Sequence, residues 1–395
     1  MSLRFSLAVL LLSISLACSA QEPVSLFFAT GTWPEVLDRA KAEQKPVFLF
    51  AYTAGCRYCR QMEQEVFPQA EVAESYNDFI NYRIDIQDGG PGEALAAQYA
   101  ITAFPTYLYF DPRGQRLHQS GSFKSPAAFI AEARNALDTD RALFSLMRRY
   151  DSGERTPELL YHYANALTGY FHEESPETQV TTEYLATQTE EELREERNLR
   201  LIFGKQPEFG SAASDYLLGH AEYFVPLFGE EEVQYTTHKI IRNAATTAGR
   251  AGDTVAYARI RESIAAYFPD TARMLALAEI NYLQGTRDWP AYAAATLSYT
   301  AGPGAEDRQT AYETAAYLNA FTEDPAILLT GAAIMELVTE REPTANYLLL
   351  YARLLHGSGQ DARALDVARR AVHASQEAGD PPEAADELLK ELGGK

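Results

Sequence analysis

Cysteine is scarce in this chain of 395 residues: there are three, and one of them, Cys18, lies in an N-terminal leader. The two that remain are Cys56 and Cys59, in the sequence Cys56-Arg57-Tyr58-Cys59. A loop this short removes little entropy from the unfolded chain when it closes, so its disulfide cannot brace a fold. No second cysteine pair is present to complete a four-ligand zinc site. The scarcity predicts a working dithiol, with no metal and no other cofactor.

Basic residues are also few. Lys and Arg total 34 against 55 Asp and Glu, which gives a net charge of −21. Nucleic acid and anionic membrane surfaces repel such a chain, and the sequence has neither a glycine-rich phosphate loop nor a basic patch. The seven histidines show no metal-ligand spacing. These absences exclude nucleic-acid partners and give no sign of a second catalytic centre.

Long hydrophobic runs are missing except near the N-terminus. Phe5 to Ala17 is an apolar stretch of 13 residues, preceded by Arg4 and followed by small residues up to Ala20. That is too short for a transmembrane helix but typical of a secretory signal peptide. We therefore expect residues 1–20 to be a signal peptide and the mature protein to be periplasmic. In the alternative, the sequence before Cys18 is a weak lipobox, and a lipid on Cys18 anchors a lipoprotein.

The dithiol stands at a change of pattern along the chain. Residues 47–52 are a continuous apolar run of strand length, whereas residues 57–67 have apolar side chains at helical spacing. Cys56 thus lies where a buried strand gives way to a helix N-terminus, whose free N–H groups and dipole favour thiolate. This predicts Cys56 as the nucleophile and Cys59 as the resolving thiol.

From roughly Ser25 to Leu137 the sequence resembles the thioredoxin superfamily. Besides the dithiol, it has Phe104-Pro105-Thr106 leading into an apolar strand at 106–110. The resemblance implies a cis Pro105 against the dithiol, with the backbone at Phe104 binding an extended substrate. Residues 59–67 are most similar to the C-terminal domains of membrane-embedded disulfide reductases. The expected fold is an α/β thioredoxin-like domain over residues 21–138, able to fold alone.

The sequence departs from thioredoxin itself at three places. Gly55 replaces a tryptophan, Arg57-Tyr58 replaces Gly-Pro, and Phe50 takes the place of a buried aspartate. Arg57 beside the thiolate should tune its acidity and stabilise the reduced form, while an apolar Phe50 should disfavour thiolate at Cys59. These effects oppose each other, so the direction of electron flow stays open.

Residues 139–395 have a helical texture rich in alanine, tyrosine and leucine. Ala278, Ala315 and Ala352 recur at intervals of 37 residues, the period of paired-helix repeats. We expect units at about 270–306, 307–343 and 344–380, with a shifted fourth unit at 233–268. The last unit resembles tetratricopeptide-type repeats, which implies an all-α TPR-like domain. The alternative is a helical packing domain without a partner.

Two functions remain. In the favoured one, the protein is a secreted cell-envelope thiol-disulfide oxidoreductase acting on protein thiols or disulfides, with an unidentified redox partner and a helical domain for substrate or partner binding. In the alternative, it is an envelope interaction scaffold whose thioredoxin-like domain binds peptide with little or no redox turnover.

Overall fold

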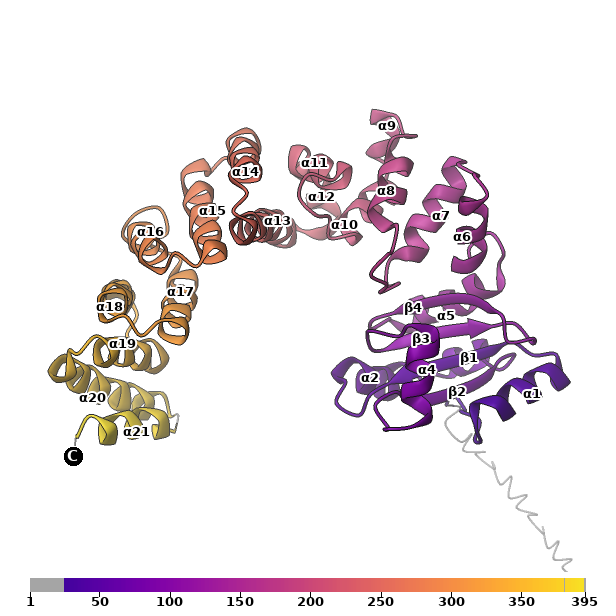
Figure 1. Ribbon diagram of the computed structural model, residues 1–395, viewed down its shortest axis with the longest axis horizontal. Coiled ribbons are helices and arrows are strands. Elements are labelled where there is room, and N and C mark those ends of the chain that lie inside the picture. Colours follow the sequence, from indigo (N-terminus) through magenta and orange to yellow (C-terminus); the bar gives the residue numbers. More distant parts are fainter. Residues whose placement is uncertain (1–24, 380, 394–395) are drawn as a thin grey trace, which may run out of the picture. The chain divides into compact units, whose positions relative to one another are not determined.

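The computed structural model describes residues 25–379 and 381–393, which form two compact units that divide between Thr187 and Gln188 (Figure 1). The expected signal peptide at 1–20 and the lipid anchor at Cys18 lie outside the described residues. None of the helices in these two ranges combines the length and the apolar character of a membrane-spanning segment.

The first unit is built on one four-stranded sheet. Its strands are β1 (Val47–Tyr52), β2 (Ile80–Asp85), β3 (Thr106–Phe110) and β4 (Arg116–Gly121), in the spatial order β2-β1-β3-β4. β1 is parallel to β2 and antiparallel to β3, and β3 is antiparallel to β4. Strands were expected at 47–52 and 106–110, where β1 and β3 lie. β4 was not, because its buried residues include His118, Gln119 and Ser120, which carry no apolar signal.

Alternate residues of the central strands supply two separate cores. Phe48, Phe50, Tyr107 and Tyr109 face one core, whereas Val47, Leu49, Leu108 and Phe110 face the other. Because successive side chains of a strand point to opposite faces, a continuous apolar run is what a sheet covered on both sides requires. The sheet is therefore the middle layer of three.

Helices cover both faces of this sheet. They are α1 (Trp33–Glu43), α2 (Arg57–Gln61), a π-helical turn η1 (Met62–Val66), α3 (Ala70–Ser75), α4 (Pro91–Tyr99) and α5 (Pro126–Leu137). The first face is covered by α2, η1, α3 and α5, and the second by α1 and α4. The single helix expected over 57–67 is thus interrupted, since its second half adopts π-helical hydrogen bonding.

The first unit continues past the expected domain end at residue 138. Three more helices belong to it: α6 (Leu143–Asp151), α7 (Pro157–Leu167) and α8 (Glu177–Leu185). α6 packs on β4, and the backbone N–H of Leu143 donates to Nδ1 of the buried His118 at 3.0 Å. Residue 138 therefore lies inside a compact unit in which α6 packs on β4, and a separate thioredoxin-like domain over residues 21–138 stays a prediction.

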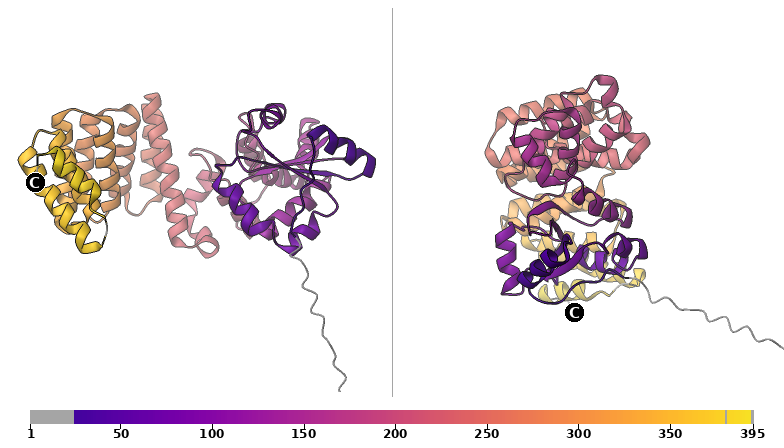
Figure 2. Two further views of the ribbon diagram at one scale, coloured as in Figure 1. Left: turned by 90° about the horizontal axis from the view of Figure 1, so that it is seen from below. Right: turned by 90° about the vertical axis from the view of Figure 1, so that its right-hand side faces the viewer.

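The described part of the second unit, 188–379 and 381–393, is helical. Its helices are α9 (Glu190–Leu193), α10 (Glu196–Gly204), α11 (Ala212–Gly219), α12 (Ala221–Phe228), α13 (Glu230–Ala251), α14 (Thr254–Tyr267), α15 (Thr271–Thr286), α16 (Trp289–Ala301), α17 (Arg308–Phe321), α18 (Pro325–Arg341), α19 (Ala345–Gly357), α20 (Asp361–Ala378) and α21 (Glu383–Glu391). From α13 onward they pack side by side, as the salmon to yellow ribbons of Figure 2 show.

Each of the ranges 270–306, 307–343 and 344–380 contains one pair of these helices. Ala278, Ala315 and Ala352 are fully buried, as small residues at close helix contacts should be. Aspartates cap successive helices: the side chains of Asp270, Asp288, Asp307 and Asp324 accept backbone N–H bonds at the start of α15 to α18. The assignment of these pairs to tetratricopeptide-type repeats stays a prediction.

Candidate dithiol site

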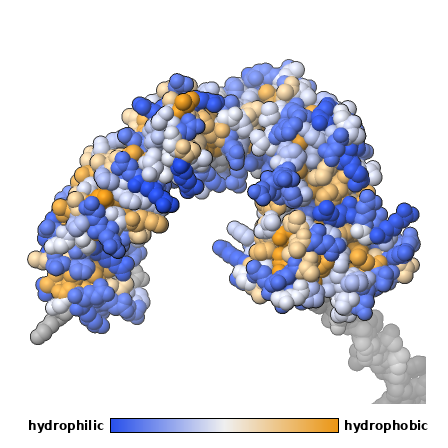
Figure 3. Space-filling model, in the orientation of Figure 1, coloured by the Kyte–Doolittle hydropathy of each residue, from blue (hydrophilic) through white to orange (hydrophobic). Residues whose placement is uncertain are grey.

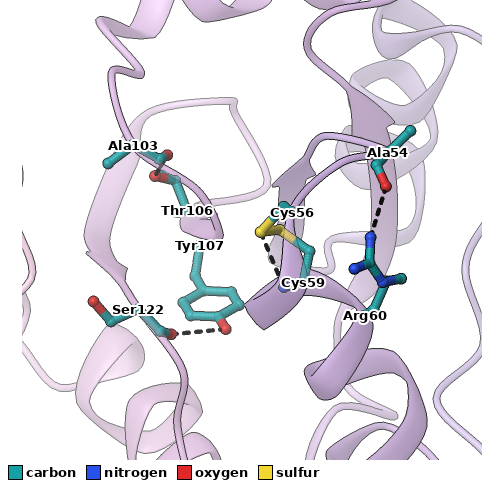
Figure 4. Close-up of a disulfide and its surroundings, with 8 residues drawn as sticks. All are labelled: Ala54, Cys56, Cys59, Arg60, Ala103, Thr106, Tyr107 and Ser122. Atoms are coloured by element: carbon teal, nitrogen blue, oxygen red, sulfur yellow. Dashed lines mark hydrogen bonds between the residues drawn. A yellow bond between two sulfur atoms is a disulfide. The ribbon is translucent and has the colours of Figure 1, made fainter. Parts of the chain in front are cut away.

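Cys56 and Cys59 are joined in a disulfide at the start of α2 (Figure 4). Cys56 is the N-cap residue of this helix, and the backbone N–H of Cys59 donates to its Sγ at 3.0 Å. Cys56 is half-buried, whereas Cys59 is only 1% exposed. The two thiols of the reduced protein would therefore differ in access, and the accessible one has a helix N–H aimed at its sulfur.

Backbone hydrogen bonds hold the turn that carries Cys56. Its own N–H donates to the carbonyl oxygen of Thr53 at 3.1 Å, which ties the turn to the end of β1. The guanidinium of Arg60 donates to the carbonyl oxygen of Ala54 at 3.1 Å. Since Arg60 is on α2, this bond fixes the helix against the strand exit. The sulfur of Cys56 is thus presented on a short, braced connection.

The segment before β3 lies beside the disulfide. The Phe104-Pro105 peptide bond is cis, as the resemblance implied, and Phe104 and Cys56 pack against the same core cluster, which contains Cys59. The Thr106 hydroxyl donates to the Ala103 carbonyl oxygen at 2.7 Å, and Figure 4 draws this bond in the surroundings of the disulfide. The carbonyl oxygen of Pro105 accepts the N–H of Ser122 at 3.1 Å. The fold therefore brings the dithiol and the Phe104-Pro105 segment together at one end of the sheet.

The environment of Cys59 is apolar. Cys59 shares a buried cluster with Phe50 and Met62, and Phe50 stacks on Tyr107 with 6.0 Å between ring centroids. The Tyr107 hydroxyl donates to the Ser122 carbonyl oxygen at 3.0 Å, and burial raises the pKa of this phenol well above its usual range. Tyr107 thus stays neutral beside the dithiol. Phe50 and Tyr107 are thus both part of the apolar environment of Cys59, and the effect of Phe50 on the Cys59 thiolate stays a prediction.

The two residues between the cysteines face solvent. Arg57 is the first residue of α2 and is exposed, and Tyr58 keeps 53% of its surface exposed. Arg57 directly follows Cys56 in the sequence, and its side chain is accessible to water. The part assigned to it, tuning the acidity of Cys56, stays a prediction.

A charged network lies farther along α5 and β4, and nothing in the sequence indicated it. Glu132 accepts from the Ser120 hydroxyl at 2.5 Å, lies 3.0 Å from Nε2 of His118 and pairs with Lys124 at 3.2 Å. Burial alone would raise the pKa of Glu132, but His118, Lys124 and Ser120 together lower it to about 2. Because Nδ1 of His118 accepts the N–H of Leu143, Nε2 carries the proton and donates to Glu132. The residues involved are up to 25 positions apart, so only the fold reveals them.

No cluster of three or more metal-ligating side chains occurs among residues 25–379 and 381–393.

Comparison with known proteins points to the same part of the chain. Residues 33–137 match the thioredoxin-like domain family. The thiol:disulfide interchange protein DsbD of Pseudoalteromonas atlantica is 31% identical over 106 residues, which are 26% of this chain and 18% of that protein. The disulfide bond reductase DsbH of Chlamydia pneumoniae is 25% identical over 118 residues, 27% of this chain and 70% of that protein.

Two solved structures cover 30% of this chain each. One is a DsbH oxidoreductase, with 22% identity, 92% of its own chain covered and a TM-score of 0.27. The other is a putative disulphide-isomerase from Bacteroides thetaiotaomicron, with 24% identity, 98% covered and a TM-score of 0.28. The chain spans less than a fifth of the length of the DsbD relative, so the similarity concerns one domain. Residues 33–137 form a thioredoxin-like domain, related to those of DsbD and DsbH, that carries a Cys56-Cys59 disulfide.

Proposed function

We propose that the protein is a thiol-disulfide oxidoreductase of the cell envelope that exchanges disulfides with protein substrates through Cys56 and Cys59. The observation that carries this proposal is the asymmetry of the pair. Cys56 is accessible and accepts a helix N–H at its sulfur, while Cys59 is buried one turn inside the helix. A nucleophile and a resolving thiol need this arrangement, since the first must reach a foreign sulfur and the second must reach only Cys56.

In the reducing direction, the Cys56 thiolate attacks one sulfur of a substrate disulfide. A mixed disulfide forms and the other substrate sulfur leaves as a thiolate, which takes up a proton. Cys59 then loses its proton and attacks Sγ of Cys56, which releases the second substrate thiol and forms the Cys56-Cys59 disulfide. Two electrons and two protons pass to the substrate. The same steps in reverse oxidise a substrate dithiol, and a redox partner restores the starting form in either direction.

Three further residues have roles in this proposal. Pro105 and Phe104 bind the extended substrate segment beside the sulfurs, which is supported by the shared packing of Phe104 and Cys56 on one cluster. Arg57 stabilises the Cys56 thiolate by its charge, which its position as the first residue of α2 supports. The helical unit binds the substrate or partner protein, and the N-terminal leader directs the chain to the periplasm.

A trapping experiment tests the assignment of the two cysteines. Cys59→Ser should accumulate substrate proteins as mixed disulfides through Cys56, because the first attack still occurs and resolution does not. Cys56→Ser should trap nothing, since Cys59 is buried. Nonreducing gels of cells that express each variant, with the double variant as control, measure this directly.

Equal adducts from both single variants would contradict the assigned roles. If the protein is instead a scaffold without redox turnover, the wild type and Cys56→Ser should not differ in their rates of reduction of a small disulfide or of insulin. The wild type should be active on both and Cys56→Ser inactive.

A further inference from the structure

The loop between α7 and α8, residues 168–176, lies outside the part of the chain that matches the thioredoxin-like family. It is braced internally: Tyr170 stacks on His172 with 5.5 Å between ring centroids, and the N–H of Ser175 donates to the His172 carbonyl oxygen at 3.0 Å. Phe171 stands between these contacts and keeps 43% of its surface exposed. The loop thus holds one aromatic side chain at the surface of the first unit.

Contacts with the thioredoxin-like fold determine where Phe171 lies. Its backbone carbonyl oxygen accepts the Thr102 hydroxyl at 3.0 Å. Its ring covers Gly121 so closely that a β-carbon there would stand 2.8 Å from the ring and 3.0 Å from the Pro105 carbonyl oxygen. Gly169, with φ of +90°, lies against the Gly121 backbone in the same way. Glycine at 121 and 169 therefore allows this loop to sit beside Pro105.

Strand register puts this contact at the dithiol end of the sheet. Ala51 of β1 pairs with Thr106 of β3, and Thr106 pairs with Gly121 of β4. Ala51 is near the end of β1, after which the chain enters the turn to Cys56. Phe171, Pro105 and the sulfurs consequently lie at the same end of the sheet, although more than a hundred residues separate Phe171 from Cys56.

Other exposed aromatic side chains occur at the dithiol end of the sheet. Tyr58, between the cysteines, is 53% exposed, and Phe123 is 37% exposed. Both neighbours of Phe123 in the chain have fixed contacts. The backbone carbonyl oxygen of Ser122 accepts the hydrogen bond of the Tyr107 hydroxyl, and the backbone N–H of Lys124 donates to Sδ of Met62 at 3.4 Å. In Figure 3, hydrophobic surface is visible over the α2 end of the first unit. Exposed aromatics around a reactive sulfur are what binding of an apolar substrate side chain requires.

We propose that Phe171 is a specificity-determining residue, forming one wall of the substrate site and selecting protein segments in which an apolar side chain adjoins the reactive cysteine. This inference rests on the proposed oxidoreductase function and adds the class of substrate. The occupant is an extended segment of another protein, because the site adjoins the Phe104-Pro105 backbone and the accessible sulfur of Cys56. Phe171 acts by contact with that segment and takes no part in the exchange of electrons.

The test uses the reduced full-length protein and three substrates. Two are disulfide-linked dimers of a short peptide that differ only in whether phenylalanine or serine flanks the cysteine on both sides, and the third is bis-hydroxyethyl disulfide. The wild type should reduce the phenylalanine peptide with a kcat/KM about tenfold above that of the serine peptide, as burial of part of an aromatic side chain would give. Phe171→Ser should lose most of this preference, and its kcat/KM should fall by a larger factor on the phenylalanine peptide than on the small disulfide.

Matched variants separate a binding role from a structural one. Phe171→Gln keeps bulk against Gly121 without the apolar surface and should behave like Phe171→Ser, whereas Phe171→Leu should retain most of the preference. Leu137→Ser is the control, because Leu137 is 52% exposed at the far end of α5, about 18 Å along the helix from its start. An unchanged peptide preference in Phe171→Gln, or an equal loss in Leu137→Ser, overturns the inference. A wild type inactive on the small disulfide overturns the proposed function itself and the inference with it.

Discussion

The two compact units build their cores in different ways. In the first unit, β1 pairs with β2 and β3, which are distant in sequence, and residues from α2, η1, α3 and α5 complete one core cluster that contains Phe129. In the second, each helix from α13 onward packs mainly on the next one or two along the chain. Loss of one element should therefore disturb the whole first unit but only a neighbourhood of the second.

This difference has a functional counterpart. A reactive dithiol needs sulfur, helix N-terminus and substrate backbone held together to within fractions of an ångström, and a sheet that ties distant segments together does that. A stack of helix pairs instead offers an extended surface, and each helix needs to pack correctly only on its neighbours along the chain. Three changes to the chain test the comparison, in order of decreasing effect.

The largest expected effect is on the stability of the first unit, when the chain is cut at residue 138 instead of residue 187. A fragment of residues 25–187 should fold and reduce a small disulfide at the rate of the full chain. A fragment ending at 138 lacks Leu143 and Leu146, both fully buried, and leaves His118 without its Leu143 partner. The loss of buried side chains should cost about 5 kcal/mol. Urea unfolding followed by circular dichroism measures it, and equal stability of the two fragments would show that α6 to α8 are dispensable.

A smaller effect is expected at the charged network on α5. The pKa of Glu132 is lowered to about 2 from an ordinary value of 4.5, with burial opposed by His118, Lys124 and Ser120. Its ionised form therefore stabilises the first unit fully above pH 4.5, and this contribution is lost as the pH falls towards 2. Glu132→Gln should lower the free energy of unfolding at pH 7 by about 2–3 kcal/mol.

Unfolding of the wild type and the variant at several pH values checks the sign. The difference between them should shrink as the pH falls from 4.5 to 2. The control is Glu71→Gln, an exposed carboxylate on α3, which should change little at any pH. If the wild type and Glu132→Gln differ in free energy of unfolding by the same amount at every pH, the contribution of Glu132 comes from its shape and not from its charge.

The smallest of the three effects is expected in the helical unit. Gly249 of α13 and Gly285 of α15 lie in contact, and a β-carbon at Gly285 would overlap backbone atoms of Thr246 and Arg250. Gly285→Ala should force the two helices apart and cost about 1–3 kcal/mol in that unit, even after the gain in helix propensity. Dithiol activity on a small disulfide should stay unchanged.

Gly204→Ala is the matched control, because nothing lies within 4 Å of a β-carbon at that helical position. It should be neutral or slightly stabilising. If Gly285→Ala also lowers activity on the small disulfide, the two units are energetically coupled and the comparison fails.

The sequence was most informative where local pattern and local structure coincide. The strand at 47–52 and the helix start at Cys56 were predicted with nearly their observed bounds, because each depends on neighbours along the chain. The polar strand β4 was missed, since its buried His118, Gln119 and Ser120 are satisfied by groups that come from elsewhere. The π-helical turn after α2 was missed as well, because no residue pattern distinguishes it from an α-helix.

By itself, the sequence determined the local features: two cysteines at a helix N-terminus, a Phe104-Pro105 segment before a strand, and a helical remainder in which alanines recur every 37 residues. Tertiary structure decided what surrounds these features. It buried Cys59 and left Cys56 accessible, placed α6 on β4, and brought Phe171 against Gly121 beside Pro105. The physical reason is range, because propensity and periodicity act over a few residues, whereas burial and close contact depend on segments that only the folded chain brings together.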